Sequence, residues 1–147
     1  MSATAQGSAA SAATPIAGAK QVLRILYADD LRELRDVARI SFSREGHAIE
    51  CVPDGLQALD RLRADPNFDL VITDHHMPLM NGLALVRALR ETDYAGKILV
   101  FSSELDPRVA SEYKALKVDR ILFKPVFPSV LRQTLAEMFG LPVKKRS

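Results

Sequence analysis

Residues 70–82, LVITDHHMPLMNG, give the clearest indication of how this chain folds. The strongly apolar run Leu70–Thr73 predicts a β-strand that is buried on both faces, and it ends at an acid, Asp74. Pro78 and Gly82 then predict a turn before an amphipathic helix. A buried strand followed by a helix is the repeating unit of parallel sheets that helices cover on both sides.

The same alternation extends in both directions from this segment. Strands are expected at residues 22–28, 48–52, 70–73, 98–101 and 121–123. Each strand is followed by apolar residues at helical spacing, in stretches that end near Gly46, Asp65, Leu89, Leu116 and Gly140. Five such units favour an open, doubly wound α/β sheet, because a closed barrel of eight units needs a much longer chain.

The composition is that of a single compact domain. The chain has 147 residues, of which 48% are hydrophobic and 26% are charged, near the average for globular proteins. Residues 1–21 are rich in Ala and Ser and lack apolar periodicity, so we expect a disordered tail there. The domain should then cover residues 22–140, and residues 141–147 should form a short basic tail.

Other features limit the classes of function. The net charge of +2 is too small to indicate binding to nucleic acid or to an anionic membrane, and a helix-turn-helix segment is absent. The sequence has no apolar stretch of the roughly 18–20 residues that a membrane span needs. Its single cysteine, Cys51, excludes an internal disulfide, which suits a cytoplasmic location, and we expect it to be a buried, inert thiol.

Polar residues that could carry chemistry follow the predicted strands. In a doubly wound sheet, ligands bind at the carboxyl ends of the strands. The residues at those ends are Asp29, Asp30, Asp74, Ser102, Ser103 and Lys124. The fold would therefore bring three carboxylates, two hydroxyls and one ammonium group to the same edge of the sheet.

This combination indicates divalent-metal and phosphoryl chemistry. Three neighbouring carboxylates repel one another, and a bound cation allows all of them to stay ionised. Ligand sets made only of oxygen favour Mg²⁺, with Mn²⁺ as an alternative. A carboxylate is also a nucleophile toward phosphorus, while a metal, a lysine and a hydroxyl can each hold a phosphoryl oxygen.

These residues resemble the receiver domain of response regulators in two-component signalling. The resemblance covers about residues 22–140 and rests on Asp29-Asp30, Asp74, Met77-Pro78, Gly82, Ser102 and Lys124-Pro125. It implies a flavodoxin-like sheet of five parallel strands in the order 2-1-3-4-5, with helices on both faces. It also implies a phosphoryl switch and not an enzyme that turns over a small molecule.

The resemblance assigns roles to the acids. Asp74 would accept a phosphoryl group from the phosphohistidine of a sensor histidine kinase or of a histidine phosphotransfer protein. Asp30 and Asp74 would bind Mg²⁺ directly, and Asp29 would bind it directly or through water. The backbone carbonyl of His76 would be the remaining protein ligand.

The resemblance also assigns roles to residues on the last two strands. Lys124, joined to Pro125 by a cis peptide bond, would pair with a phosphoryl oxygen, and Ser102 would move to hydrogen-bond the phosphoryl group. That movement would reshape the face made by the helix at 107–116, the strand at 121–123 and the last helix. Through this face the domain would bind a downstream protein, whose identity the sequence does not reveal, or form a homodimer.

One position departs from the pattern of these domains. Ile121 lies three residues before Lys124, where receivers usually carry an aromatic residue whose rotamer reports phosphorylation. Tyr113 and Phe123 are the aromatic residues that could take over this part, although neither is at the matching position.

Further residues are expected around the site. In receiver domains the position of Ser103 usually carries a small residue, which gives the phosphoryl group access, and Ser fits this pattern. His76 and Glu104 occupy the two positions that tend to set the rate of autodephosphorylation in these domains. Since no third soft ligand lies at zinc spacing, we expect His75 and His76 to be exposed residues on the rim. We also expect His47 to be a surface histidine.

The sequence leaves alternatives to a phosphoryl switch. Only nine residues follow Met138, so we expect a stand-alone receiver that docks on a target, although a longer protein with an effector domain also fits. Ile121 keeps open a scaffold that is never phosphorylated. An aspartyl phosphatase of the haloacid-dehalogenase kind is disfavoured, because its second acid would lie at His76.

Overall fold

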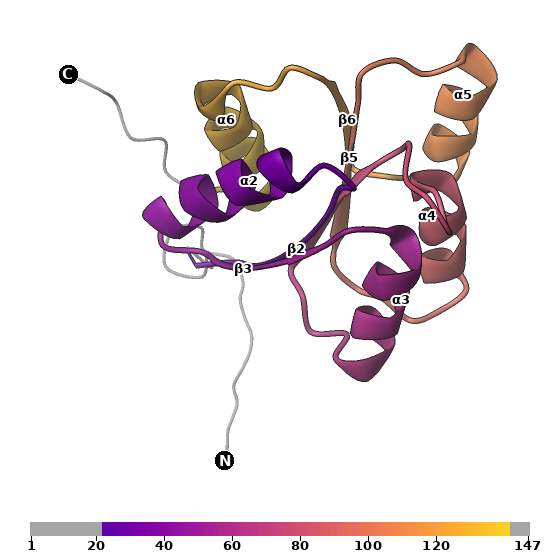
Figure 1. Cartoon of the computed structure of the whole chain (residues 1–147), viewed down its shortest axis with the longest axis horizontal. Coiled ribbons are helices and arrows are strands. Elements are labelled where there is room, and N and C mark those ends of the chain that lie inside the picture. Colours follow the sequence, from indigo (N-terminus) through magenta and orange to yellow (C-terminus); the bar gives the residue numbers. More distant parts are fainter. Residues whose placement is uncertain (1–21, 142–147) are drawn as a thin grey trace. The chain divides into compact units, whose positions relative to one another are not determined.

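The computed structural model describes residues 22–141, which form two compact units, residues 22–125 and residues 126–141. Strands and helices alternate along these residues (Figure 1). The strands are β2 (Arg24–Ala28), β3 (Ala48–Val52), β4 (Leu70–Asp74), β5 (Lys97–Ser102) and β6 (Arg120–Phe123). The helices are α2 (Arg32–Arg44), α3 (Gly55–Ala64), α4 (Gly82–Arg90), α5 (Pro107–Ala115) and α6 (Pro128–Phe139).

The strands of the first unit form one parallel sheet in the order β3-β2-β4-β5-β6. Counted along the chain, this is the order 2-1-3-4-5, so the prediction of a flavodoxin-like, doubly wound sheet is confirmed. In the centre of the sheet, Leu26 of β2 is in register with Glu50 of β3 and with Val71 of β4.

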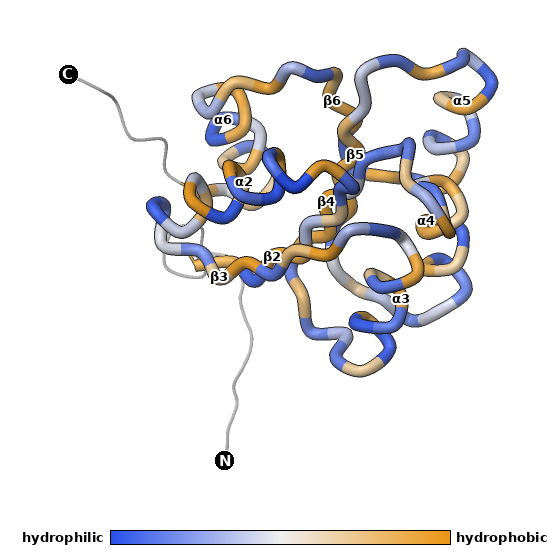
Figure 2. The backbone as a smooth tube through the Cα atoms, in the orientation of Figure 1, coloured by the Kyte–Doolittle hydropathy of each residue, from blue (hydrophilic) through white to orange (hydrophobic). Residues whose placement is uncertain are grey.

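Helices cover both faces of this sheet: α2 lies on one face, and α3, α4 and α5 lie on the other (Figure 1). Figure 2 shows that hydrophobic residues are concentrated along the strands. A core cluster of buried residues joins strand residues to all three helices of the second face, with Val71, Ile98, Leu59, Leu85 and Tyr113 among its members. Each fully buried aliphatic side chain of this kind contributes about 1.5–3 kcal/mol through the hydrophobic effect.

Side chains cap three of these helices at their starts. Asp54, Asn81 and Asp106 each accept a hydrogen bond from a backbone N–H in the first turn of α3, α4 and α5. Helix α2 differs, because its N-cap residue is Leu31 and has no side-chain hydrogen bond. The acids that precede α2 therefore do not occupy its N-cap position, and the carboxylate of Asp29 instead accepts the backbone N–H of Leu31, the N-cap residue.

Three expectations for β2 and β3 are corrected. The strand expected from Val22 begins at Arg24, because the N–H of Leu23 donates to Nδ1 of His47 (3.0 Å) instead of to a neighbouring strand. His47 is accordingly only 9% exposed, so the prediction of a surface histidine is wrong. Burial raises the pKa of the Cys51 thiol, which agrees with an unreactive group, although this residue is half-buried and not fully buried.

The second unit consists of α6 and its flanking residues. Pro128 lies in the first turn of α6, and Gly140 ends the helix with a left-handed φ of 68°. The predicted tail at residues 1–21 and nearly all of the one at residues 141–147 lie outside the described residues. Between residues 22 and 141, none of the helices combines the length and the hydrophobicity that a membrane crossing requires.

Candidate functional site

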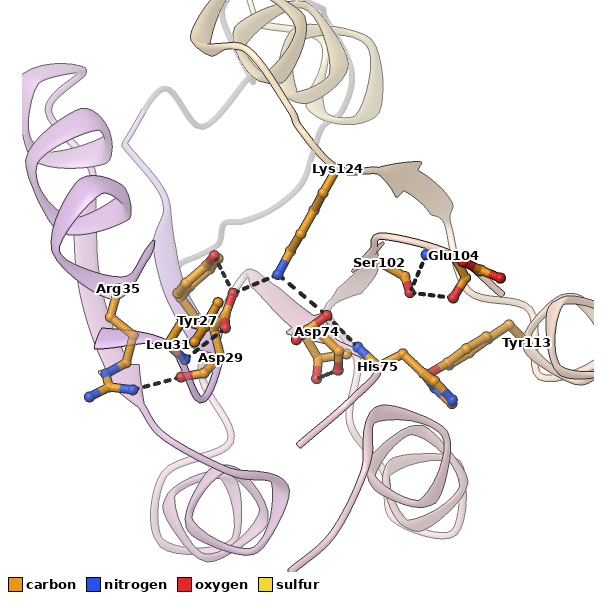
Figure 3. A network of polar contacts seen from close by, with 11 residues as sticks. Tyr27, Asp29, Leu31, Arg35, Asp74, His75, Ser102, Glu104, Tyr113 and Lys124 are labelled. Atoms are coloured by element: carbon orange, nitrogen blue, oxygen red, sulfur yellow. Dashed lines mark hydrogen bonds and ion pairs between the residues drawn. The ribbon is translucent and has the colours of Figure 1, made fainter. Parts of the chain in front are cut away.

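The parallel strands deliver the predicted polar residues to one edge of the sheet (Figure 3). Asp29 and Asp30 follow β2, Asp74 is the last residue of β4, Ser102 is the last residue of β5, and Lys124 follows β6. They reach the same edge because the carboxyl ends of parallel strands all point the same way.

Lys124 joins the two buried acids. Its Nζ lies 3.1 Å from Oδ2 of Asp29 and 3.5 Å from Oδ1 of Asp74. The side chains of Asp29 and Asp74 are 1% and 9% exposed, and that of Lys124 is 19% exposed. Because buried charges are costly unless they are paired, the ammonium group offsets part of the cost of burying both carboxylates.

Asp29 makes contacts through both carboxylate oxygens. Oδ1 accepts the backbone N–H of Leu31 at 3.0 Å, and Oδ2 accepts the hydroxyl of Tyr27 at 3.0 Å as well as Lys124. Burial, together with the charge of Asp29, raises the pKa of Tyr27, so this hydroxyl stays protonated and donates. The carbonyl of Asp29 accepts Nη1 of Arg35 at 2.8 Å. Tyr27 was not predicted as a site residue, because its position within the apolar strand β2 gives no sign of a polar contact.

Three carboxylates form a candidate metal site. Asp29, Asp30 and Asp74 each offer one oxygen, and these oxygens all lie within 4.8 Å of one another. Asp30 is exposed, which leaves a route to solvent. Burial raises the pKa of Asp74, and Asp29 raises it further, while Lys124 acts in the opposite direction. A cluster of hard oxygens that lacks full charge compensation fits Mg²⁺ or Mn²⁺.

Ser102, Ser103 and Glu104 were predicted to lie around the phosphoryl group. The hydroxyl of Ser102, however, bonds to the backbone of Glu104. Ser102 is fully buried, and its Oγ donates to the carbonyl of Glu104 (3.0 Å) and accepts the N–H of the same residue (3.3 Å). The hydroxyl is therefore held by its own loop, and its contact with a phosphoryl group stays a prediction. Ser103 and Glu104 are exposed, and the Lys124–Pro125 peptide bond is cis, as predicted.

Ile121, at the position where receiver domains usually carry an aromatic residue, packs against the hydrophobic core. Ile121 of β6 is partly buried and packs against the main cluster. Of the two aromatic candidates, Phe123 is 56% exposed, whereas Tyr113 is fully buried.

His75 differs from its prediction as an exposed rim residue. It is only 8% exposed, and its Nδ1 lies 2.6 Å from the hydroxyl of Tyr113. Counting in steps of two from Val71 places His75 on the same face of the strand as Val71, which packs in the core cluster, so this signal was present in the sequence. His76 is exposed, as expected, and its carbonyl as a metal ligand stays a prediction.

The fold and the site together define a flavodoxin-like α/β domain with a lysine and three acids at the carboxyl edge of its sheet. The chain belongs to the response regulator receiver domain family, which it matches over residues 25–136. Receiver domains are signalling switches of two-component systems, and they generally bind Mg²⁺ at an acidic cluster of this kind.

Similar proteins share the domain over different fractions of their length. The chain is 30% identical over 121 residues to the chemotaxis protein CheY1 of Helicobacter pylori, which covers 80% of this chain and 98% of CheY1. It is 33% identical over 120 residues to the sensory/regulatory protein RpfC of Xanthomonas campestris, which covers 79% of this chain and only 16% of RpfC. The match to the sensor histidine kinase AruS of Pseudomonas aeruginosa covers 13% of AruS. This chain therefore spans less than a fifth of RpfC and AruS.

Solved structures agree with the fold. The chemotaxis protein CheY4 of Vibrio cholerae superposes with a TM-score of 0.73 at 30% sequence identity, over 79% of this chain and 98% of CheY4. A CheY-like receiver domain from Methanospirillum hungatei gives a TM-score of 0.76 at 21% identity, over 80% of this chain and 93% of that one, which supports the fold alone.

Proposed function

We propose that Asp74 accepts a phosphoryl group from a phosphohistidine in a Mg²⁺-dependent reaction, and that the chain acts as a switch. The observation that carries this proposal is the position of Lys124 Nζ between the carboxylates of Asp29 and Asp74. A carboxylate oxygen of Asp74 would form a bond to phosphorus, and the P–N bond of the donor would break. The electron pair of that bond would remain on the imidazole of the donor.

The side chains of the site have separate parts in this transfer. Oδ1 of Asp74 accepts the N–H of His75 and faces Lys124, while Oδ2 has no hydrogen bond or ion pair with any described residue. The ammonium of Lys124 would neutralise a phosphoryl oxygen. Asp29, Asp30 and Asp74, with the carbonyl of His76, would hold the metal. Bound Mg²⁺ would supply positive charge to the phosphoryl oxygens.

The donor would be a sensor histidine kinase or a histidine phosphotransfer protein. This part of the proposal is supported by the similarity to receiver segments in RpfC and AruS, whose names describe a sensory protein and a sensor histidine kinase. Phosphohistidine donors are made inside the cell, so the chain would act in the cytoplasm.

The output would be a change of shape that a downstream protein reads. Ser102 would leave the Glu104 backbone for the phosphoryl group, and the loop between β5 and α5 would move with it. The surface near α5 and β6, which includes the exposed Phe123, would then bind a downstream protein or a second copy of this chain.

A scaffold that works without phosphorylation is the second candidate, and Ile121 at the usual aromatic position favours it. Intact mass after incubation of the full chain with phosphoramidate and Mg²⁺ at neutral pH separates the two. The proposal expects one added phosphoryl group in the native chain and in Asp93→Asn, which changes an exposed acid outside the site, and none in Asp74→Asn. No added mass in a folded, Mg²⁺-binding chain would instead support the scaffold.

A further inference from the structure

Tyr113 is the fully buried aromatic residue of α5, and it points toward the phosphoacceptor strand (Figure 3). Its hydroxyl lies 2.6 Å from Nδ1 of His75, and the two rings meet edge to face with centroids 5.6 Å apart. This contact joins positions 38 residues apart in the chain. It therefore connects α5 to the residue that directly follows Asp74.

His75 is in turn fixed to the site through its backbone. Its N–H donates to Oδ1 of Asp74 (2.9 Å) and to the carbonyl of Phe101 (3.2 Å). Its carbonyl accepts the N–H of Gly82 at 2.9 Å. A shift of the Asp74 carboxylate thus acts on the backbone N–H of His75, and the imidazole of the same residue is hydrogen-bonded to Tyr113.

The space for this contact depends on a glycine. A Cβ at Gly82 would lie 2.7 Å from the hydroxyl of Tyr113 and 2.5 Å from the carbonyl oxygen of Asp74. Since real Cβ atoms do not approach other atoms so closely, the start of α4 allows the Tyr113 hydroxyl to reach His75 only because residue 82 lacks a side chain. The hydrogen bond between Tyr113 of α5 and His75 therefore also depends on Gly82 of α4.

We propose that Tyr113 is a positioning residue that transmits the phosphorylation state of Asp74 to α5 through its hydrogen bond with His75. The inference rests on the proposed function of Asp74. β6 packs against the core through the aliphatic Ile121, so the buried aromatic side chain next to the site comes from α5. The contact between Tyr113 and His75 supplies a direct physical connection in this part of the chain.

The test compares Tyr113→Phe, which keeps the ring and removes the hydroxyl, with the native chain. Beryllofluoride with Mg²⁺ mimics an aspartyl phosphate, and amide chemical shifts are recorded for residues 70–75 and 107–115. A matched control is Tyr94→Phe, because Tyr94 is also buried and, among the described residues, its hydroxyl bonds only to the backbone carbonyls of Phe68 and Lys97. The nitrogen shifts of the His75 ring give a direct readout of the contact.

A net hydrogen bond corresponds to about a three- to tenfold change in an equilibrium constant, so its loss should be visible. In Tyr113→Phe, we expect shift changes near Asp74 as in the native chain, and changes in α5 that fall to less than about half. Tyr94→Phe should respond like the native chain. An undiminished α5 response in Tyr113→Phe would overturn the inference.

Two further outcomes are informative. If Tyr113→Phe does not fold, His75→Phe removes the imidazole that pairs with the Tyr113 hydroxyl while keeping a ring, and it should show the same loss in α5. A full α5 response in that variant would also overturn the inference. If the native chain does not respond to beryllofluoride at all, the proposed function of Asp74 fails, and the inference fails with it.

Discussion

Nζ of Lys124 lies 3.1 Å from Oδ2 of Asp29, although 95 residues separate these two positions in the chain. The same nitrogen lies 3.5 Å from Oδ1 of Asp74, so one ammonium group is shared by two buried carboxylates. A divalent cation at these carboxylates would compensate the same negative charge. Lys124 and a bound metal ion would therefore repel each other while both stabilise the acids.

Lys124→Met should consequently increase the affinity for Mg²⁺ and destabilise the metal-free protein. Removal of the ammonium group ends its repulsion of the metal, which we expect to raise the affinity about three- to tenfold. Without metal, Asp29 and Asp74 lose their counter-charge, and the free energy of unfolding should fall by about 1–3 kcal/mol. Calorimetric titration with Mg²⁺ and urea unfolding in a chelator measure the two effects.

The matched control is Lys114→Met, which removes an exposed lysine of α5. It should change neither the Mg²⁺ affinity nor the stability beyond about 0.5 kcal/mol. If Lys124→Met binds Mg²⁺ as weakly as the native chain, the metal does not share the carboxylates that the lysine contacts.

Asp30→Asn should separate metal binding from stability. Asp30 is exposed, whereas Asp29 is buried against Lys124 and Tyr27. Loss of a ligand should weaken Mg²⁺ binding at least about tenfold. In a chelator, Asp30→Asn should unfold like the native chain, while Asp29→Asn should be less stable because it leaves Lys124 with one carboxylate fewer. Equal Mg²⁺ affinity in Asp30→Asn and the native chain would remove Asp30 from the metal site.

Most of the fold could be predicted because buried strands carry a strong signal. The run Leu70–Thr73 is apolar on both faces, and the structure places both faces of β4 in the interior. The start of β2 could not be placed from its own residues. Its first pairing depends on His47, which takes the N–H of Leu23, and this contact arises only after the chain has folded.

The acids and the lysine of the site could be predicted because parallel topology brings strand ends together, whatever the side chains are. Hydrogen bonds between side chains inside the site were harder to predict. Tyr27 bonds to Asp29, and Tyr113 bonds to His75, through side chains whose identity gives no periodic pattern. The orientation of Ser102 is set by the Glu104 backbone, so it depends on the conformation of a loop.

Gly82→Ala should destabilise the protein, and Tyr113→Phe should relieve part of the loss. The new Cβ would lie 2.5 Å from the carbonyl oxygen of Asp74 and 2.7 Å from the hydroxyl of Tyr113. Overpacking of this kind costs about 1–3 kcal/mol. Since Tyr113→Phe removes the second contact, the double variant should lose less stability than the sum of the two single variants in urea unfolding.

Gly46→Asn provides the comparison for a glycine without neighbours. A Cβ at Gly46 has nothing within 4 Å, and Asn tolerates its positive φ better than most residues do. This variant should therefore lose about 1 kcal/mol or less. Strictly additive losses for Gly82→Ala and Tyr113→Phe would show that the Cβ does not meet the tyrosine hydroxyl.

The stability of the protein should fall as the pH drops through the titration of His47. Its Nδ1 accepts the N–H of Leu23, so a proton on this nitrogen would replace the hydrogen bond. Burial lowers the pKa of His47 below its ordinary value of 6.5, and nearby Glu45 opposes this only in part. The unfolded chain therefore binds more protons between the two pKa values, and the stabilisation present above pH 6.5 is lost below it.

His47→Asn keeps an acceptor that does not titrate, so its free energy of unfolding should lose about 1 kcal/mol less than that of the native chain between about pH 7.5 and 5.5. Urea unfolding across this range measures the difference, with His76→Asn as the control for an exposed histidine. Equal pH dependence in His47→Asn and the native chain would show that the imidazole of His47 is not held in its neutral form by the fold.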